Sequence, residues 1–360
     1  MIRFLRDLPK KFLNQTITKK IITIVLLLLY ITVFLSVLVK VNVEVMTPGV
    51  VNGIAYTNDD NHAVGVLKID TNNKSGNIFT VGIYSHQRVS LFQYLISKFS
   101  NDITFYPYNP KTDLTEKEEI IRGEIHRDFS LTHALIVGYE AASVVDSSIH
   151  IEYELKGLIV SAVLPYSQSA LLAGDIITHL EGEEIINYVD FVNKLTLLPN
   201  KNAFAVTVIR NNQTKIISAK KVENAGSYKI GIEASEYYII DEEKTTPKFI
   251  ISKNIPSLGS SGGAMTALAI YNALLPEDIT NNKRIAGTGS IKVNGEVGDI
   301  GGVEQKIVTA VLYNIDIFFV YGGKYPEAKA KYDEINAQYQ LVEINTFDDI
   351  LSALRGDNNE

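Results

Sequence analysis

A serine stands where a glycine-rich turn runs into a helical pattern. Residues 259–263 read Gly-Ser-Ser-Gly-Gly, and the apolar residues after them recur at helical spacing. Backbone N–H groups in the first turn of a helix can stabilise the oxyanion that forms when a serine attacks a carbonyl. Ser261 is therefore a candidate nucleophile, and its oxyanion site would be shaped by the loop residues Gly259, Ser260 and Gly262. Taken alone, the segment favours an ordinary helix-capping serine in a flexible loop.

Lys306 could supply the base that such a serine needs. It follows the pair Gly301-Gly302 in the first turns of a second predicted helix, among apolar neighbours such as Ile307 and Ala310. Desolvation disfavours the charged amine and lowers its pKa, so that a neutral lysine can accept the proton of a serine hydroxyl. Without the serine loop, Lys306 would be interpreted as a solvated helix lysine.

The elements expected around these residues alternate strands and helices. Between the serine and the lysine the pattern predicts a strand, a hairpin turn at Asn294-Gly295 and a second short strand. Upstream, we expect strands over 64–69 and 77–84, and helices over 110–122 and 128–144.

The segment Ile21–Val39 contains no charged residue. Its nineteen residues would span about 28 Å as a helix, which is close to the thickness of a bilayer's hydrocarbon core. The basic residues Arg3, Arg6, Lys10, Lys11, Lys19 and Lys20 precede it. The positive-inside rule then predicts a cytoplasmic tail over 1–20, a transmembrane helix over 21–39, and an extracellular remainder at the cell membrane. The alternative is a cleavable signal peptide, but the apolar run is long and no Ala-x-Ala-like site follows, which favours an uncleaved anchor.

Composition excludes several classes of function. The net charge is −7, which argues against nucleic acid as a partner. The absence of cysteine excludes disulfides, thiolate metal sites and cysteine catalysis. None of the six histidines lies in a metal-binding or hydrolase motif, and no phosphate-binding P-loop occurs, so we expect no metal, no cofactor and no ATP.

Residues 155–222 have an organisation of their own. A strand-like run over Gly157–Val163 is followed by the Ala173–Ile176 turn, a helix over Tyr188–Leu197 and a strand over Ala203–Arg210. This order resembles a PDZ domain of the type found in bacterial proteases. The resemblance implies that a peptide adds as a strand beside Gly157, Leu158, Ile159 and Val160. The alternative is a small β-rich domain that only packs on its neighbour.

The serine and lysine segments together resemble the proteolytic domain of the Lon family. In that family the nucleophile lies in a Gly-Pro-Ser-Ala-Gly loop, and the lysine ends a Gly-Gly-apolar-x-x-Lys motif. Here 45 positions separate Ser261 from Lys306, which ends Gly-Gly-Val-Glu-Gln-Lys. The resemblance implies a Ser261–Lys306 dyad, with Thr288 matching a family threonine that lines the site.

Two positions depart from the family pattern. Ser260 replaces the proline and Gly262 replaces the alanine, and both changes make the loop more flexible. Neither removes a catalytic atom. Ser260 is chemically a rival nucleophile, and only its register in the motif favours Ser261.

The whole chain is similar to membrane-anchored, PDZ-containing Lon-like peptidases. We expect an α+β fold, with an N-terminal ectodomain part over 41–150, a PDZ-like insertion over 151–225 and a Lon-type proteolytic domain over 226–355. The resemblance implies an ATP-independent serine endopeptidase whose substrates are secreted peptides, unfolded proteins or extracellular segments of membrane proteins, with lipid contacted through the anchor. The alternative is an inactive, membrane-tethered adaptor that only binds peptides.

Overall fold

The computed structural model describes residues 12–54, 67–69, 77–200, 202–251, 255 and 257–356. The chain divides into two compact units, which are described separately below. The first consists of Met1–Met46 and Ser85–Tyr108, and the second of Thr47–Tyr84 and Asn109–Glu360. The predicted basic tail over 1–20 lies mostly outside the described residues, because the description begins at residue 12.

The first unit is dominated by the apolar helix α2 (Ile17–Leu38). With 22 residues and a mean hydropathy of 2.9, it is long and apolar enough to cross a bilayer, and a signal sequence near an N-terminus has the same properties. The short helix α3 (Leu91–Ser97) begins with a capping box, in which Ser90 and Gln93 satisfy each other's backbone N–H groups. Strand β4 (Thr104–Pro107) pairs antiparallel with the first residues of β1 (Val43–Gly53).

A mostly parallel sheet forms the centre of the second unit. Its strands β3 (Ile78–Gln87), β14 (Ile285–Thr288), β17 (Ile317–Tyr321) and β18 (Gln340–Ile344) lie in the order β18-β17-β14-β3, followed by β1. Because side chains alternate along a strand, Ile317 and Phe319 face one hydrophobic cluster, while Phe318 and Val320 face another. Both faces of this sheet are therefore buried, as parallel sheets require.

Helices cover the two faces of the sheet. The first cluster includes residues of α4 (Glu116–Ser143), α6 (Gly263–Leu274) and α9 (Phe347–Gly356). The second includes residues of α7 (Val303–Leu312) and α8 (Tyr325–Glu334), which the 3-10 helix η1 (Gly322–Lys324) precedes. The pairs β2 (Leu67–Ile69) with β13 (Phe249–Ile251), and β15 (Ser290–Ile291) with β16 (Val297–Gly298), complete this part.

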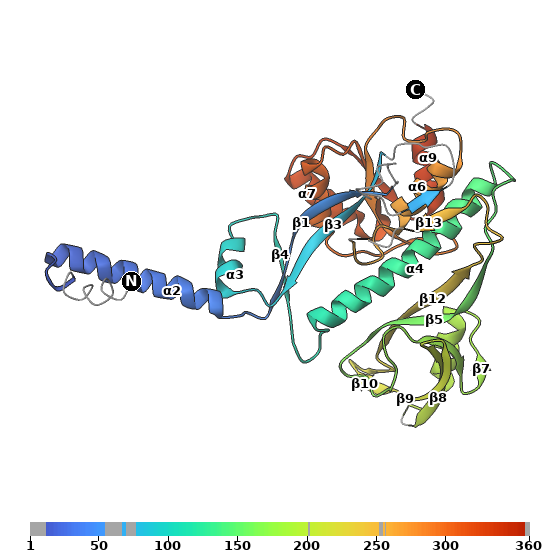
Figure 1. The fold of residues 1–360 in the computed structure, drawn as a ribbon, viewed down its shortest axis with the longest axis horizontal. Coiled ribbons are helices and arrows are strands. Elements are labelled where there is room, and N and C mark those ends of the chain that lie inside the picture. The colour runs from blue at the N-terminus through green and yellow to red at the C-terminus, as the bar shows by residue number, and fades with distance from the viewer. Residues whose placement is uncertain are drawn as a thin grey trace. The chain divides into compact units, whose positions relative to one another are not determined.

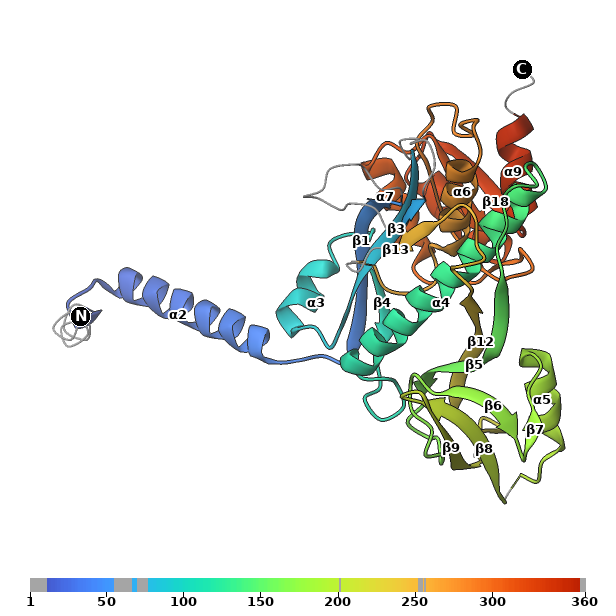
Figure 2. The same ribbon diagram turned by 45° about the vertical axis from the view of Figure 1, so that its right-hand side comes forward.

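Helix α4 is longer than the sequence predicts. The expected helices over 110–122 and 128–144 are one continuous helix of 28 residues, which begins after Thr115. Thr115 and Glu118 form a capping box there, and three glutamates in the first turn complement the helix dipole. Figure 2 shows α4 running between the sheet of β5 and β12 and the helix α6, and both neighbours are packed against it.

The residues between α4 and β13 form a β-rich module with its own hydrophobic core. It contains β5 (Tyr153–Val163), β6 (Ile176–Leu180), β7 (Glu183–Glu184), α5 (Tyr188–Leu197), β8 (Ala203–Arg210), β9 (Gln213–Lys220), β10 (Val222–Asn224), β11 (Ser227–Lys229) and β12 (Ile232–Ile240). The predicted bounds of α5 and β8 are confirmed. The predicted boundary at residue 225 is wrong, because β12 pairs with β5 along its length and so extends this sheet to Ile240.

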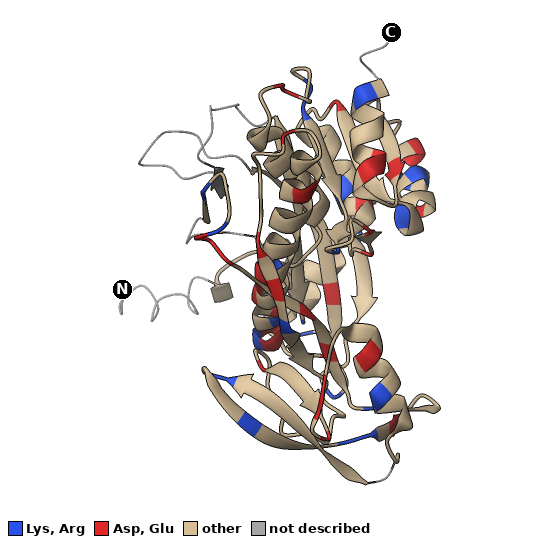
Figure 3. Ribbon diagram, turned by 90° about the vertical axis from the view of Figure 1, so that its right-hand side faces the viewer, with Lys and Arg blue, Asp and Glu red and all other residues tan. Residues whose placement is uncertain are grey.

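The start of the module can be followed in Figure 1, where α4 leads directly into β5. Figure 3 shows the Lys and Arg positions scattered singly among the acidic ones on the side that faces the viewer.

Candidate active site

The serine loop sits at the start of α6, as predicted. Gly262 is the N-cap of this helix, so Ser261 lies one residue before it. The Ser261 carbonyl oxygen accepts a hydrogen bond from the Gly289 N–H at 2.8 Å, and the Ala264 N–H donates to the Gly289 carbonyl at 3.0 Å. These two bonds hold the start of α6 against the segment that follows β14.

Helix α4 holds the other side of the same loop. The Gly259 N–H donates to the Gly123 carbonyl oxygen at 2.8 Å, and Ser130 Oγ donates to the Ser260 carbonyl oxygen at 3.2 Å. Gly259 has φ +86°, a conformation that glycine adopts without strain. Nothing local in the sequence indicates that α4 reaches this loop.

Steric crowding explains why glycine occupies position 262. A Cβ atom there would lie 2.7 Å from Cγ2 of Thr80, which comes from strand β3. The next residue is equally crowded, because a Cβ at Gly263 would lie 2.7 Å from Ser130 Oγ and 3.0 Å from the Ile291 backbone nitrogen. The departure at Gly262 from the family alanine therefore leaves space for Thr80, a residue that no sequence motif connected to the loop.

Lys306 lies in the first turn of α7 and is almost fully buried, with 2% of its surface exposed. Gly302, the N-cap of α7, has φ +62° and thus uses the left-handed conformation that glycine favours. Burial lowers the pKa of Lys306 from 10.5 to about 7, because the charged amine loses its hydration. A large fraction of this side chain is therefore uncharged at neutral pH.

Thr288 connects the lysine to the serine. Lys306 Nζ donates to Thr288 Oγ1 at 2.8 Å, and Thr288 Oγ1 donates to the Ser261 carbonyl oxygen at 3.4 Å. Together these distances place Nζ within about 6 Å of the Ser261 carbonyl oxygen. The Thr288 hydroxyl donates its hydrogen bond to the Ser261 carbonyl oxygen, so it can only accept one from Lys306 Nζ. The lone pair of a neutral amine at Nζ is then available to a different hydrogen-bond donor.

Among the described residues, no hydrogen bond joins Lys306 Nζ to the Ser261 hydroxyl. Catalytic hydrogen bonds are often long in ligand-free sites and shorten when substrate binds. The three predicted residues Ser261, Lys306 and Thr288 are thus brought to one place, with Thr288 between the other two.

The hairpin predicted between serine and lysine is confirmed. Ser290 pairs with Gly298 and Ile291 with Val297 in an antiparallel ladder, and Gly295 in its turn has φ +81°. Ile291 is buried, and its backbone nitrogen would lie 3.0 Å from a Cβ at Gly263, so the hairpin packs against the start of α6.

The peptide site predicted along Gly157, Leu158, Ile159 and Val160 does not fit the observed sheet. These residues belong to β5, which pairs with β12 on one edge and with β6 on the other. A peptide cannot add as a strand where both edges already carry hydrogen bonds. Gly157 has a structural role instead, since a Cβ there would collide with the Ile177 carbonyl oxygen.

Within the described part of the chain, no group of three or more acidic or histidine side chains is arranged to hold a metal ion.

The site thus brings together a buried lysine, a threonine and a serine loop at the start of a helix, on a mostly parallel sheet that helices cover. Residues 213–355 match the family described as Lon protease (S16) C-terminal proteolytic domain. A curated relative named "Lon protease" from Malacoplasma penetrans (strain HF-2) is 29% identical over 131 residues, or 35% of this chain. The chain spans only 15% of the length of that relative. A Lon proteolytic domain is therefore present, and this domain points to a serine peptidase.

Proposed function

We propose that this protein is an ATP-independent serine endopeptidase in which Ser261 is the nucleophile and Lys306 its general base. The observation that carries the proposal is the buried Lys306, whose amine is linked through the Thr288 hydroxyl to the backbone of Ser261 and whose pKa burial lowers to about 7. An amine in this state can take a proton at neutral pH, which a solvated lysine cannot do. The Lon-type proteolytic domain supports the same conclusion.

The proton has a simple path in this mechanism. The Ser261 hydroxyl attacks a peptide carbonyl while Lys306 Nζ takes the hydroxyl proton, and backbone N–H groups at the start of α6 stabilise the oxyanion. Lys306 then gives the proton to the leaving amine, and water hydrolyses the acyl-enzyme. Thr288 positions Nζ throughout, because its hydroxyl is itself fixed by the Ser261 carbonyl. General-base and oxyanion effects each supply on the order of 10²–10⁴-fold in rate.

The proposal places the catalytic region outside the cell. The support is the apolar helix α2 together with the basic residues before it, which favour a cytoplasmic N-terminus. Substrates are then secreted peptides or extracellular segments of membrane proteins. The 360 residues contain no P-loop motif, and the proposed mechanism does not require ATP.

A peptide end would reach the β-rich module at β12 rather than at β5. Strand β12 ends its sheet, whose order is β12-β5-β6-β8-β9, so its outer edge pairs with no strand among the described residues. The start of helix α5 lies beside this strand, since the Tyr188 N–H donates to Glu236 Oε1 at 2.9 Å. Strand addition along Ile232–Ser235 is the binding mode that this arrangement favours.

The test is covalent labelling of the full chain with a fluorophosphonate probe, followed by mapping of the labelled peptide. The native protein and Ser260→Ala should both carry the label on residue 261, whereas Ser261→Ala should carry none. Lys306→Ala should lose at least about a hundredfold in labelling rate, as expected when a general base is removed.

Peptide binding without any labelling of the native protein would support the adaptor instead. Labelling that persists in Ser261→Ala and disappears in Ser260→Ala would assign the nucleophile to the neighbouring serine.

A further inference from the structure

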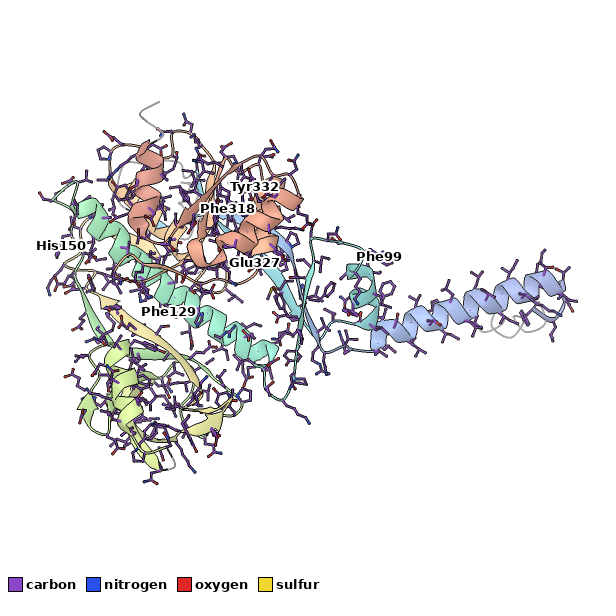
Figure 4. All side chains as sticks on the ribbon, turned by 180° about the vertical axis from the view of Figure 1, so that it is seen from behind. Phe99, Phe129, His150, Phe318, Glu327 and Tyr332 are labelled. Atoms are coloured by element: carbon purple, nitrogen blue, oxygen red, sulfur yellow. The ribbon has the colours of Figure 1, made fainter. Side chains whose placement is uncertain are left out.

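The short helix α3 exposes an apolar patch made of Leu95, Ile96 and Phe99. Phe99 is 92% exposed, and Leu95 and Ile96 are each about half exposed. Leu95 and Ile96 are adjacent residues in the last turn of α3, and Phe99 follows just after the helix ends at Ser97. Their neighbour Tyr94 is packed instead, because its ring meets the Phe105 ring of β4 edge to face at 5.4 Å. Figure 4 shows Phe99 at the end of α3, pointing away from the ribbon.

This patch lies close to the end of the apolar helix α2. The Leu91 N–H at the start of α3 donates to the carbonyl oxygen of Val39, the residue that caps α2, at 2.8 Å. A second bond joins the Val41 N–H to the Val89 carbonyl oxygen at 3.0 Å. Helix α3 therefore begins where the chain leaves α2.

Because α3 is short, the patch lies near the end of α2. Seven helical residues span about 10 Å, so Leu95, Ile96 and Phe99 stay within about two helical turns of the α2 end. The polar headgroup region of a bilayer is of a similar depth. The capping box at Ser90 holds the helix in place, so the patch is carried by a fixed backbone.

Two lysines lie near the patch. Lys98 is exposed between Ile96 and Phe99, with its amine 4.5 Å from the centre of the Tyr94 ring. Lys40 lies opposite Ser90 in a β-bridge at the start of α3. Amines beside exposed apolar side chains fit a surface that offers phosphate groups above hydrocarbon.

We propose that the Leu95, Ile96 and Phe99 patch docks into the headgroup–acyl boundary of the bilayer that α2 crosses. The inference rests on the proposed membrane anchor and adds a second, interfacial contact to it. A single membrane-spanning helix can rotate and tilt in the bilayer. A second contact with the bilayer beside the helix restricts both motions. The patch would thus set the orientation of the first unit on the membrane.

The chain contains no tryptophan, so a single introduced tryptophan reports on its own surroundings. Three variants of the full chain are reconstituted in vesicles of brominated phosphatidylcholine, whose bromines quench tryptophan on contact. Phe99→Trp tests the patch, and Leu29→Trp reports on the middle of α2. Leu197→Trp, which is 85% exposed at the end of α5, is the matched control away from α2.

The expected result is that Phe99→Trp and Leu29→Trp lose most of their fluorescence, while Leu197→Trp keeps it. Quenching of Leu29→Trp without quenching of Phe99→Trp would overturn the docking and leave the anchor intact. A blue-shifted but unquenched Phe99→Trp would show that protein, not lipid, covers the patch. If neither Leu29→Trp nor Phe99→Trp is quenched, both the anchor and the docking are overturned. If Leu197→Trp is quenched as strongly as Phe99→Trp, the contact of the patch with lipid is not specific and the docking is refuted.

Discussion

The burial that leaves Lys306 neutral near pH 7 also destabilises the folded chain. The pKa of Lys306 is about 7 in the folded chain, whereas a solvated lysine, as in the unfolded chain, has a pKa of 10.5. Between these two values the unfolded state binds more protons than the folded state, so stability rises as the pH is raised through this window. Below about pH 7 the penalty is fully present.

Lys306→Met should therefore be more stable than the native chain at neutral pH. Methionine has a similar length and no charge to desolvate, so the free energy of unfolding should rise by on the order of 2–4 kcal/mol, after the lost hydrogen bond to Thr288 is deducted. Urea unfolding from pH 6 to pH 10 measures the difference, which should shrink as the pH approaches 10.5. A variant less stable than the native chain at pH 7 would mean that Lys306 is stabilised by groups outside the described site.

The residues of the site could be predicted from the sequence, whereas the residues that pack against the serine loop could not. Ser261, Thr288 and Lys306 carry recognisable local motifs, and the structure brings them together. Thr80 and Ser130 touch the same loop from β3 and α4, which are far away in the sequence. A single sequence holds no local signal for such contacts, because they depend on how distant elements pack.

At the scale of elements, Gly262 is a point of close approach between strand β3 and the start of helix α6. Gly262→Ala should place a methyl group against Thr80 Cγ2 and lower both stability and labelling rate, with a stability loss of roughly 1–3 kcal/mol. Adding Thr80→Ser removes that methyl group and should recover most of the loss. Thermal unfolding and fluorophosphonate labelling of the two single variants and the double variant measure the effect. Equal losses in Gly262→Ala with and without Thr80→Ser would refute the steric explanation.

Local patterns also explain which elements could be predicted. Helix α5 and strand β8 have clear helical and alternating patterns, and the Asn211-Asn212 turn ends β8, with both asparagines at positive φ. The pairing of β12 with β5 joins residues more than 60 positions apart, so its place in the sheet had no local signal. For that reason the sequence alone did not indicate that both edges of β5 are paired.

At the scale of the whole second unit, His133 of α4 links the β-rich module to the proteolytic part. Its Nδ1 lies 3.1 Å from the Ile291 carbonyl oxygen in β15, and its Nε2 lies 3.2 Å from the Glu236 carbonyl oxygen in β12. A neutral imidazole can donate to only one of these carbonyls, whereas the protonated ring can donate to both. Burial lowers the pKa of His133, and the two carbonyls oppose that shift.

His133→Ala should loosen both connections at once. One of the two carbonyls loses its donor and the packing of the ring is lost, so stability should fall by roughly 2–4 kcal/mol, and hydrogen exchange should accelerate in Ile232–Ile240 and in Ser290–Ile291 together. His150→Ala, at an exposed histidine beside Glu152, is the control and should change neither segment. Faster exchange in only one of the two segments would show that His133 does not couple them.

The central claim is that an uncharged Lys306 activates Ser261, and the pH dependence of fluorophosphonate labelling tests it most directly. For the native chain between pH 5 and pH 10, the labelling rate should rise about tenfold per pH unit at low pH and level off above about pH 7, following the neutral fraction of Lys306. In Lys306→Ala this rise should be absent. A native profile that is flat across pH 7, or that is unchanged in Lys306→Ala, would contradict the account.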